Sequence, residues 1–190
     1  MTEMMTTDVR AIMDRTPFDV SAVADLREVL NRDPSRYRTL RDAVSTIRDR
    51  EKAQEGGGSP ESHLRLGVGE VLLGRYAAGL ENLKRAGDQG MALYFQGLAY
   101  ENLQKYQEAA EAFGKSATLG YDPKNSELRR AGALRRLGQL DEANGRSEEA
   151  AKKLAEAKAL LQGLEASVGS SAEFHFQQGA ILAAEGELEK

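Results

Sequence analysis

Few side chains in this sequence have the types and spacing that catalysis or metal binding requires. The chain contains two histidines, His63 and His175, and no cysteine. The absence of cysteine excludes disulfides, thiolate metal sites and cysteine nucleophiles. No part of the sequence resembles a nucleophile–base pair or a cluster of metal ligands. We therefore expect no enzymatic activity, no metal and no cofactor.

A glycine-rich run between Gly67 and Gly74 superficially resembles a phosphate-binding loop. Such a loop follows a strand and continues into Gly-Lys-Ser or Gly-Lys-Thr, and this sequence has neither feature. We therefore interpret these glycines as points of close contact between helices.

Arginines gather in one segment, and the cluster has two interpretations. Its members are Arg129, Arg130, Arg135 and Arg136. They are either ordinary surface charge or a site for an acidic peptide or a carboxylate, which the planar guanidinium group binds well. A second basic face is interleaved with aspartates and is expected to be solvated; it contains Arg38, Arg41, Arg48 and Arg50.

The charge balance and hydropathy limit the class of partner. The 190 residues include 26 basic and 30 acidic side chains, which gives a formal net charge of −4 and argues against direct nucleic-acid binding. No stretch has 18 consecutive apolar residues, and the N-terminus lacks the apolar run of a signal peptide. We expect no membrane segment and a cytoplasmic location.

Apolar residues recur at three- and four-residue intervals along nearly the whole chain, which predicts an all-α fold. Residues 1–54 form an N-terminal helical segment: a short first turn, then a hairpin divided at Asp33-Pro34, where Asp33 caps and Pro34 opens the second helix. Residues 55–62 contain three consecutive glycines and are expected to be a flexible linker.

The remaining residues, 63–190, contain an internal repeat. The second copy is the clearest, with small and aromatic residues in the order Gly97, Tyr100, Tyr106, Ala109 and Phe113. This pattern resembles the tetratricopeptide repeat (TPR), a helix–turn–helix unit of ~34 residues. The resemblance implies a solenoid, an α–α superhelix, that follows the N-terminal hairpin. It also places His63 and His175 at the same repeat position, which favours a packing role for both.

The repeats are expected at 63–90, 91–123, 124–169 and 170–190, the last truncated. Gly74, Gly138 and Gly186 are assigned to the turns inside the repeats, so that the second helix of repeat three begins near Leu140 and extends to about Glu165. A competing register places this turn at Asn144-Gly145 instead and makes Gly138 a helix-contact residue. The favoured register rests on the match of residues 139–143 to the family's turn.

The family's usual ligand site is the concave groove formed by the first helix of each repeat. Carried over to this chain, the resemblance gives a partner-binding groove of Leu64, Val68, Tyr94, Leu98, Glu101, Asn102, Leu128, Arg135, Arg136 and Phe176. Some of the apolar members have an alternative role in packing against the N-terminal hairpin. Leu64 and Val68 replace the Lys and Asn with which co-chaperone TPR proteins hold a terminal carboxylate, so that clamp is absent.

The function implied is a non-catalytic scaffold or adaptor that binds a protein or peptide in this groove. One alternative is self-assembly into a homodimer through the incomplete fourth repeat. Another is the regulatory N-terminal part of a longer protein, because the chain is loosely similar to bacterial TPR proteins that end in an RNA polymerase alpha-subunit-type DNA-binding domain. The end of the sequence inside repeat four leads us to expect a fragment.

Overall fold

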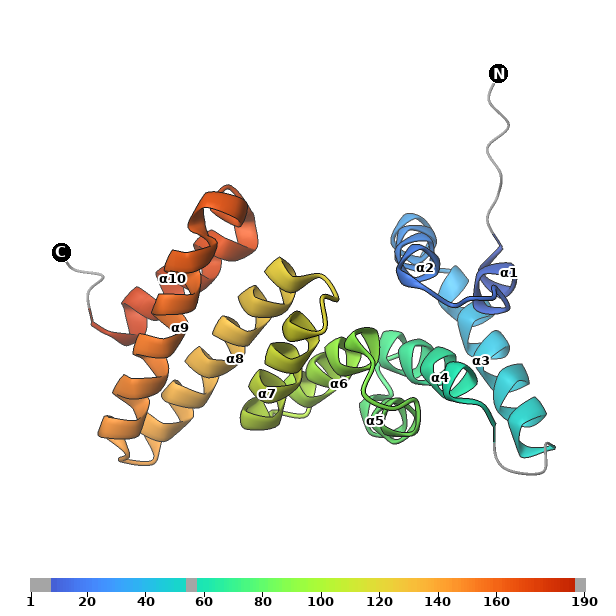
Figure 1. Ribbon diagram of the computed structural model, residues 1–190, viewed down its shortest axis with the longest axis horizontal. Coiled ribbons are helices and arrows are strands. Elements are labelled where there is room, and N and C mark those ends of the chain that lie inside the picture. The colour runs from blue at the N-terminus through green and yellow to red at the C-terminus, as the bar shows by residue number, and fades with distance from the viewer. Residues whose placement is uncertain (1–7, 54–57, 187–190) are drawn as a thin grey trace, which may run out of the picture. The chain divides into compact units, whose positions relative to one another are not determined.

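The computed structural model describes residues 8–53 and 58–186, and within these ranges every regular element is an α-helix. The all-α prediction is thus confirmed for the described residues. Contacts divide the chain into two compact units, up to Asp88 and from Gln89 onward. The first unit contains α1 (Val9–Met13), α2 (Val20–Arg32), α3 (Arg36–Lys52), α4 (Pro60–Leu72) and α5 (Tyr76–Arg85) (Figure 1). The second contains α6 (Gly90–Asn102), α7 (Tyr106–Thr118), α8 (Pro123–Ala143), α9 (Ser147–Val168) and α10 (Ala172–Ala184).

The division between the units falls about one repeat later than the linker suggested. Residues 55–57 of that linker lie outside the described residues. Helix α4 begins at Pro60, inside the expected linker, and the Ser59 hydroxyl caps it by accepting a bond from the Ser62 N–H. Close packing joins α4 to the N-terminal helices, because a Cβ at Gly69 would lie 2.5 Å from the Val44 side chain.

In the N-terminal helices, the Asp33 carboxylate accepts bonds from the N–H and the hydroxyl of Ser35. Helix α3 nevertheless begins at Arg36, two residues after Pro34, the residue expected to open it.

Each of the three helical hairpins between α4 and α9 closes over a glycine. A Cβ at Gly97 on α6 would lie 2.6 Å from the Phe113 ring on α7, and one at Gly67 on α4 would lie 2.5 Å from Leu83 on α5. Gly138 on α8 meets Leu154 on α9 in the same way, at 3.2 Å. The glycine and its bulky partner are 16 residues apart in all three hairpins. The helix-contact role expected for Gly67 and Gly97 therefore extends to Gly138.

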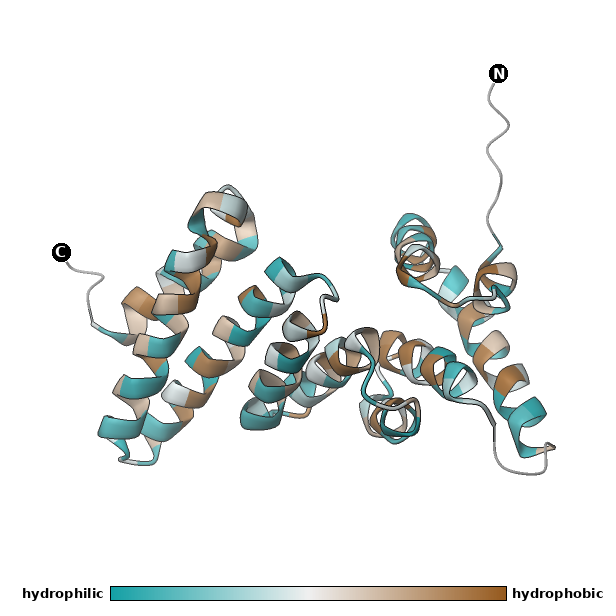
Figure 2. Cartoon of the chain, in the orientation of Figure 1, coloured by the Kyte–Doolittle hydropathy of each residue, from teal (hydrophilic) through white to brown (hydrophobic). Residues whose placement is uncertain are grey.

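The favoured register of repeat three is wrong at its turn. Helix α8 continues through Gly138 to Ala143, and the chain turns at residues 144–146, as the competing register had it. Gly145 supplies the left-handed backbone that the turn needs, with φ +75°, and the Arg146 N–H bonds to the Asp141 carbonyl at 2.9 Å. The hairpin end around this turn is hydrophilic (Figure 2).

The turn at Gly145 has counterparts in the other hairpins. Gly74 and Gln104 occupy the same place, seven residues after Gly67 and Gly97, with φ of 74° and 59°. In both turns the residue after the left-handed one donates a hydrogen bond from its N–H to the carbonyl oxygen five residues earlier, with N–O distances of 2.8 and 2.9 Å. Gly186 follows Gly179 by seven residues as well, with φ +70°. The repeat therefore consists of a contact glycine, a left-handed turn residue and a bulky residue at fixed spacing.

None of the helices within the described ranges combines the length and the hydropathy that crossing a membrane demands.

Candidate interaction face

The ten predicted binding residues divide between the two units, and half of them are buried. Leu64 and Val68 on α4 are 4% and 0% exposed. These two side chains are therefore packed in the interior, in line with the alternative packing role rather than the expected contact with a ligand.

In the second unit, Tyr94, Leu128 and Arg135 are also almost completely buried. The Tyr94 ring meets Phe113 edge-on, with centroids 5.6 Å apart, and its hydroxyl accepts a bond from Asn125 Nδ2 at 2.9 Å. Tyr94 thus connects α6 to α7 and α8 inside the core. The expectation that Tyr94 and Leu128 present their side chains to a partner is corrected by this burial.

What stays accessible is a polar surface on three helices of the second unit, which we call the α6–α8–α10 face. Leu98 and Glu101 are partly exposed, while Asn102, Arg136 and Phe176 are exposed. With the neighbours that hold it together, the face comprises Leu98, Glu101, Asn102, Arg129, Arg135, Arg136, Glu173, Phe176 and Gln177. Five of the predicted ten residues therefore supply its open part.

Arg135 organises the junction of α8 and α10. Its Nε donates to Gln177 Oε1 at 3.0 Å, and its Nη1 donates to Gln139 Oε1 at 2.9 Å. Gln177 Nε2 in turn donates to Glu173 Oε1 at 2.8 Å. A Cβ at Gly132 would lie 2.8 Å from that same Nε2, so glycine at this position leaves room for the Gln177 amide.

The other end of Arg135 contacts an exposed aromatic ring. The guanidinium carbon lies 5.8 Å from the centroid of the Phe176 ring, within cation–π range. Phe176 is nevertheless 57% exposed. An exposed apolar ring thus lies against a buried cation.

The charges of the face are unevenly paired. Glu101 on α6 forms an ion pair with Arg129 on α8 at 3.5 Å. Burial raises the pKa of Glu101, an effect that Arg129 opposes and the negative charge of Glu173 reinforces. Among the described residues, no carboxylate lies within ion-pair distance of Arg135.

Neither Arg135 nor Arg136 has a carboxylate within ion-pair distance among the described residues, although the negative charges of Glu101 and Glu173 act on Arg135. Burial lowers the pKa of Arg135, and the neighbouring Arg136 lowers it further, but a guanidinium group stays protonated at neutral pH. Arg136 is exposed and forms no hydrogen bond or ion pair with any residue in the described ranges.

The four-arginine cluster of the sequence therefore separates into two kinds of side chain. Arg129 and Arg130 are neutralised by acids, since Arg130 pairs with Glu127 at 3.4 Å and with Glu156 at 2.8 Å. These two partly exposed side chains therefore link α8 to α6 and α9 through ion pairs. The carboxylate-binding interpretation is confined to Arg135 and Arg136, which lie in the middle of α8.

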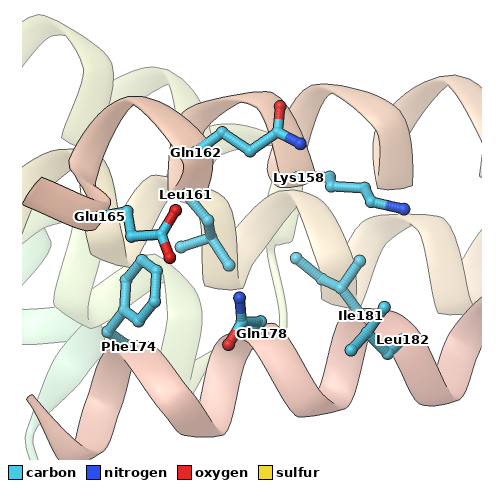
Figure 3. A pocket seen from close by; sticks show the side chains of 8 residues that line it. All are labelled: Lys158, Leu161, Gln162, Glu165, Phe174, Gln178, Ile181 and Leu182. Carbon is cyan, nitrogen blue, oxygen red and sulfur yellow. The ribbon is translucent and has the colours of Figure 1, made fainter. Parts of the chain in front are cut away.

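A small apolar pocket lies between α9 and α10. Figure 3 shows Leu161 of α9 and Phe174 and Ile181 of α10 pointing into it, with Lys158 and Glu165 at its rim. Its volume of about 80 Å³ is far below the ~300–1,000 Å³ of small-molecule sites. The pocket fits an apolar side chain rather than a cofactor.

The sequence interpretation missed a buried ion pair in the first unit. Glu70 on α4 is completely buried and pairs with Arg48 of α3 and with Arg75, at 3.3 Å from the latter. The expectation that Arg48 is simply solvated is therefore wrong, because its guanidinium group pairs with a buried carboxylate. A carboxylate inside the apolar run from Gly67 to Leu73 was the available signal, because a buried charge needs a partner.

His63 and His175 differ in the structure although they share a repeat position. His63 is buried, with Nδ1 3.4 Å from Asn82 Oδ1, as its expected packing role requires. His175 is exposed and meets the Phe174 ring edge-on at a centroid distance of 5.8 Å. The packing role expected for His175 is therefore limited to this ring contact.

Within the part of the chain that the structure describes, no group of three or more His, Asp or Glu side chains could hold a metal ion. Comparison with models of known protein families gave no match, and comparison with curated proteins gave none.

Proposed function

We propose that this chain is a non-catalytic interaction module of the TPR kind, which binds a partner protein or peptide through the α6–α8–α10 face. The repeated hairpin supports the proposal: a contact glycine, a left-handed residue seven positions later and a bulky residue 16 positions later recur in three hairpins. Such arrays present rigid helices as extended binding surfaces.

The observation that carries the choice of face is the exposed Phe176 ring held against the buried Arg135 guanidinium. Aromatic and arginine side chains dominate the binding energy of protein interfaces. To the extent that this contact restrains the ring, Phe176 loses less conformational entropy when a partner covers it.

The test is affinity capture with the full chain from a lysate of the cells that naturally make it, followed by mass spectrometry. The double variant R136E/F176A changes only exposed side chains of the face. We expect it to lose specific partners that the wild-type chain captures.

A matched control carries the same kinds of change elsewhere in the second unit. Lys115 on α7 is exposed, and Leu119 is 54% exposed against 57% for Phe176. K115E/L119A should therefore capture the same partners as the wild type. Equal capture by R136E/F176A and wild type would reject the α6–α8–α10 face.

Self-association is a second candidate function, favoured by the pocket of Figure 3. A pocket of side-chain size between two helices accepts an apolar residue from a second copy in the way that helix surfaces interlock. Leu182, which lines the pocket and is partly exposed, is the position at which a charged substitution would test it.

A further inference from the structure

The α6–α8–α10 face carries three arginines and two glutamates, which leaves an excess of one positive charge. Glu101 pairs with Arg129, and Glu173 accepts a bond from Gln177. Among the described residues, Arg135 donates hydrogen bonds to the neutral amides of Gln139 and Gln177 and to no carboxylate. Together with Arg136, which forms no ion pair among the described residues, the face therefore presents two guanidinium groups that have no carboxylate in direct contact.

This arrangement favours a negatively charged partner segment over a neutral or a basic one. A neutral segment would remove water from Arg136 and give nothing in return, and a basic segment would meet like charge. A carboxylate would instead accept charge-assisted hydrogen bonds in the fork geometry of the guanidinium group. The exposed Phe176 ring beside Arg135 adds an apolar contact that a free inorganic anion does not use.

We infer that the partner of this face is an acidic peptide segment, with a carboxylate bound at Arg136 and an apolar side chain against Phe176. This inference rests on the proposed binding function. In it, Arg135 is a positioning residue: it holds the Phe176 ring and, with Arg136, sets the positive charge of the surface.

The first experiment selects random peptides displayed on phage against the full 190-residue chain. Peptides enriched on the wild-type chain should be rich in Asp and Glu, with apolar residues beside them. A matched selection on R136E should no longer enrich acidic peptides, whereas one on K115E should enrich the same peptides as wild type.

The second experiment measures the affinity of one enriched acidic peptide for a series of charge variants by fluorescence anisotropy. Removing a positive charge with R136Q should weaken binding about fivefold, the upper range for an exposed ion pair, and R136E should weaken it further. Removing a negative charge with E101Q should tighten binding. A loss of structure could not produce this opposite change.

The outcomes separate this inference from the proposed function. Enriched peptides that are not acidic, yet lose binding in R136E/F176A, keep the face and overturn the acidic partner. Enriched peptides that bind R136E/F176A as tightly as the wild type reject the face itself. Failure to enrich any peptide, or weaker binding to E101Q, also counts against the inference.

Discussion

Glu101 shows how the charge of one side chain depends on both burial and neighbours. Its carboxylate lies beside Arg129, which favours the ionised form, but burial outweighs this and raises its pKa. The folded chain therefore binds this proton more tightly than the unfolded chain does. Stability from this group is then present at low pH and is lost as the pH rises from the ordinary glutamate range through the raised pKa.

The variant E101Q tests this sign. Because glutamine carries no charge to desolvate, we expect E101Q to be at least as stable as the wild type near about pH 7, and to lose that relative advantage near about pH 4. Urea unfolding at both pH values measures the difference. A wild type that gains stability relative to E101Q as the pH rises would show that the ion pair with Arg129 dominates instead.

At the residue scale, repeat position identified several residues of the open face but predicted the exposure of side chains poorly. Glu101, Arg136 and Phe176 were chosen by repeat position and lie on the open face. Tyr94 was chosen by the same rule and is buried, because the residues Met91 to Gly97 of α6 are buried on all sides. Without an amphipathic pattern in that helix, the sequence carries no signal of which side is open.

At the scale of helices and turns, the left-handed residue of each hairpin offers a direct test. Glycine occupies this place at positions 74 and 145, but Gln104 adopts φ 59° in the corresponding turn. A left-handed conformation strains a residue that has a Cβ. We expect Q104G to raise the free energy of unfolding by about 0.5–1 kcal/mol and G145A to lower it by about as much, measured by chemical denaturation. Destabilisation by Q104G would mean that the glutamine side chain matters more than backbone strain.

Replacing a helical glycine by alanine should lower or raise the stability of the protein, depending on whether another side chain lies close to the new methyl group. G97A would force a methyl group to within 2.6 Å of the Phe113 ring and should cost about 1–3 kcal/mol. Gly163 on α9 has open space around its Cβ position, so G163A should stabilise the helix by about 0.5–1 kcal/mol. Thermal and urea unfolding compare the two variants, and equal effects would contradict the close approach at Gly97.

The helices themselves were largely predictable, and one turn was not. Periodicity gave the hairpins and the contact glycines Gly67 and Gly97, because tight packing demands small residues at fixed spacing. The turn of repeat three was misplaced because residues 139–143, which resemble a turn sequence, form the last residues of α8. The pair Asn144-Gly145 was the stronger physical signal, since glycine there can adopt the left-handed backbone.

For the molecule as a whole, the distribution of exposed apolar side chains bears on assembly. Among the described residues, the large ones are spread over different helices and helix ends: Val20, Tyr37, Leu103, Leu119, Leu140 and Phe176. A stable dimer usually buries about 800 Å² per partner in one continuous patch.

We therefore expect light scattering to give a single mass near 20.7 kDa at all concentrations tested. A mass that rises with concentration would favour self-association. If L182E then restored the single-chain mass, the pocket between α9 and α10 would be the interface.

The Gln177 amide, between a buried cation and a carboxylate, has a practical consequence. Its oxygen must point to Arg135 and its nitrogen to Glu173, since the reverse orientation would set donor against donor and acceptor against acceptor. The two side-chain amide protons therefore have fixed, distinct surroundings. In an isotope-labelled chain these two protons can be followed by NMR. An anion bound at Arg136 should shift their resonances, and the partner itself needs no label.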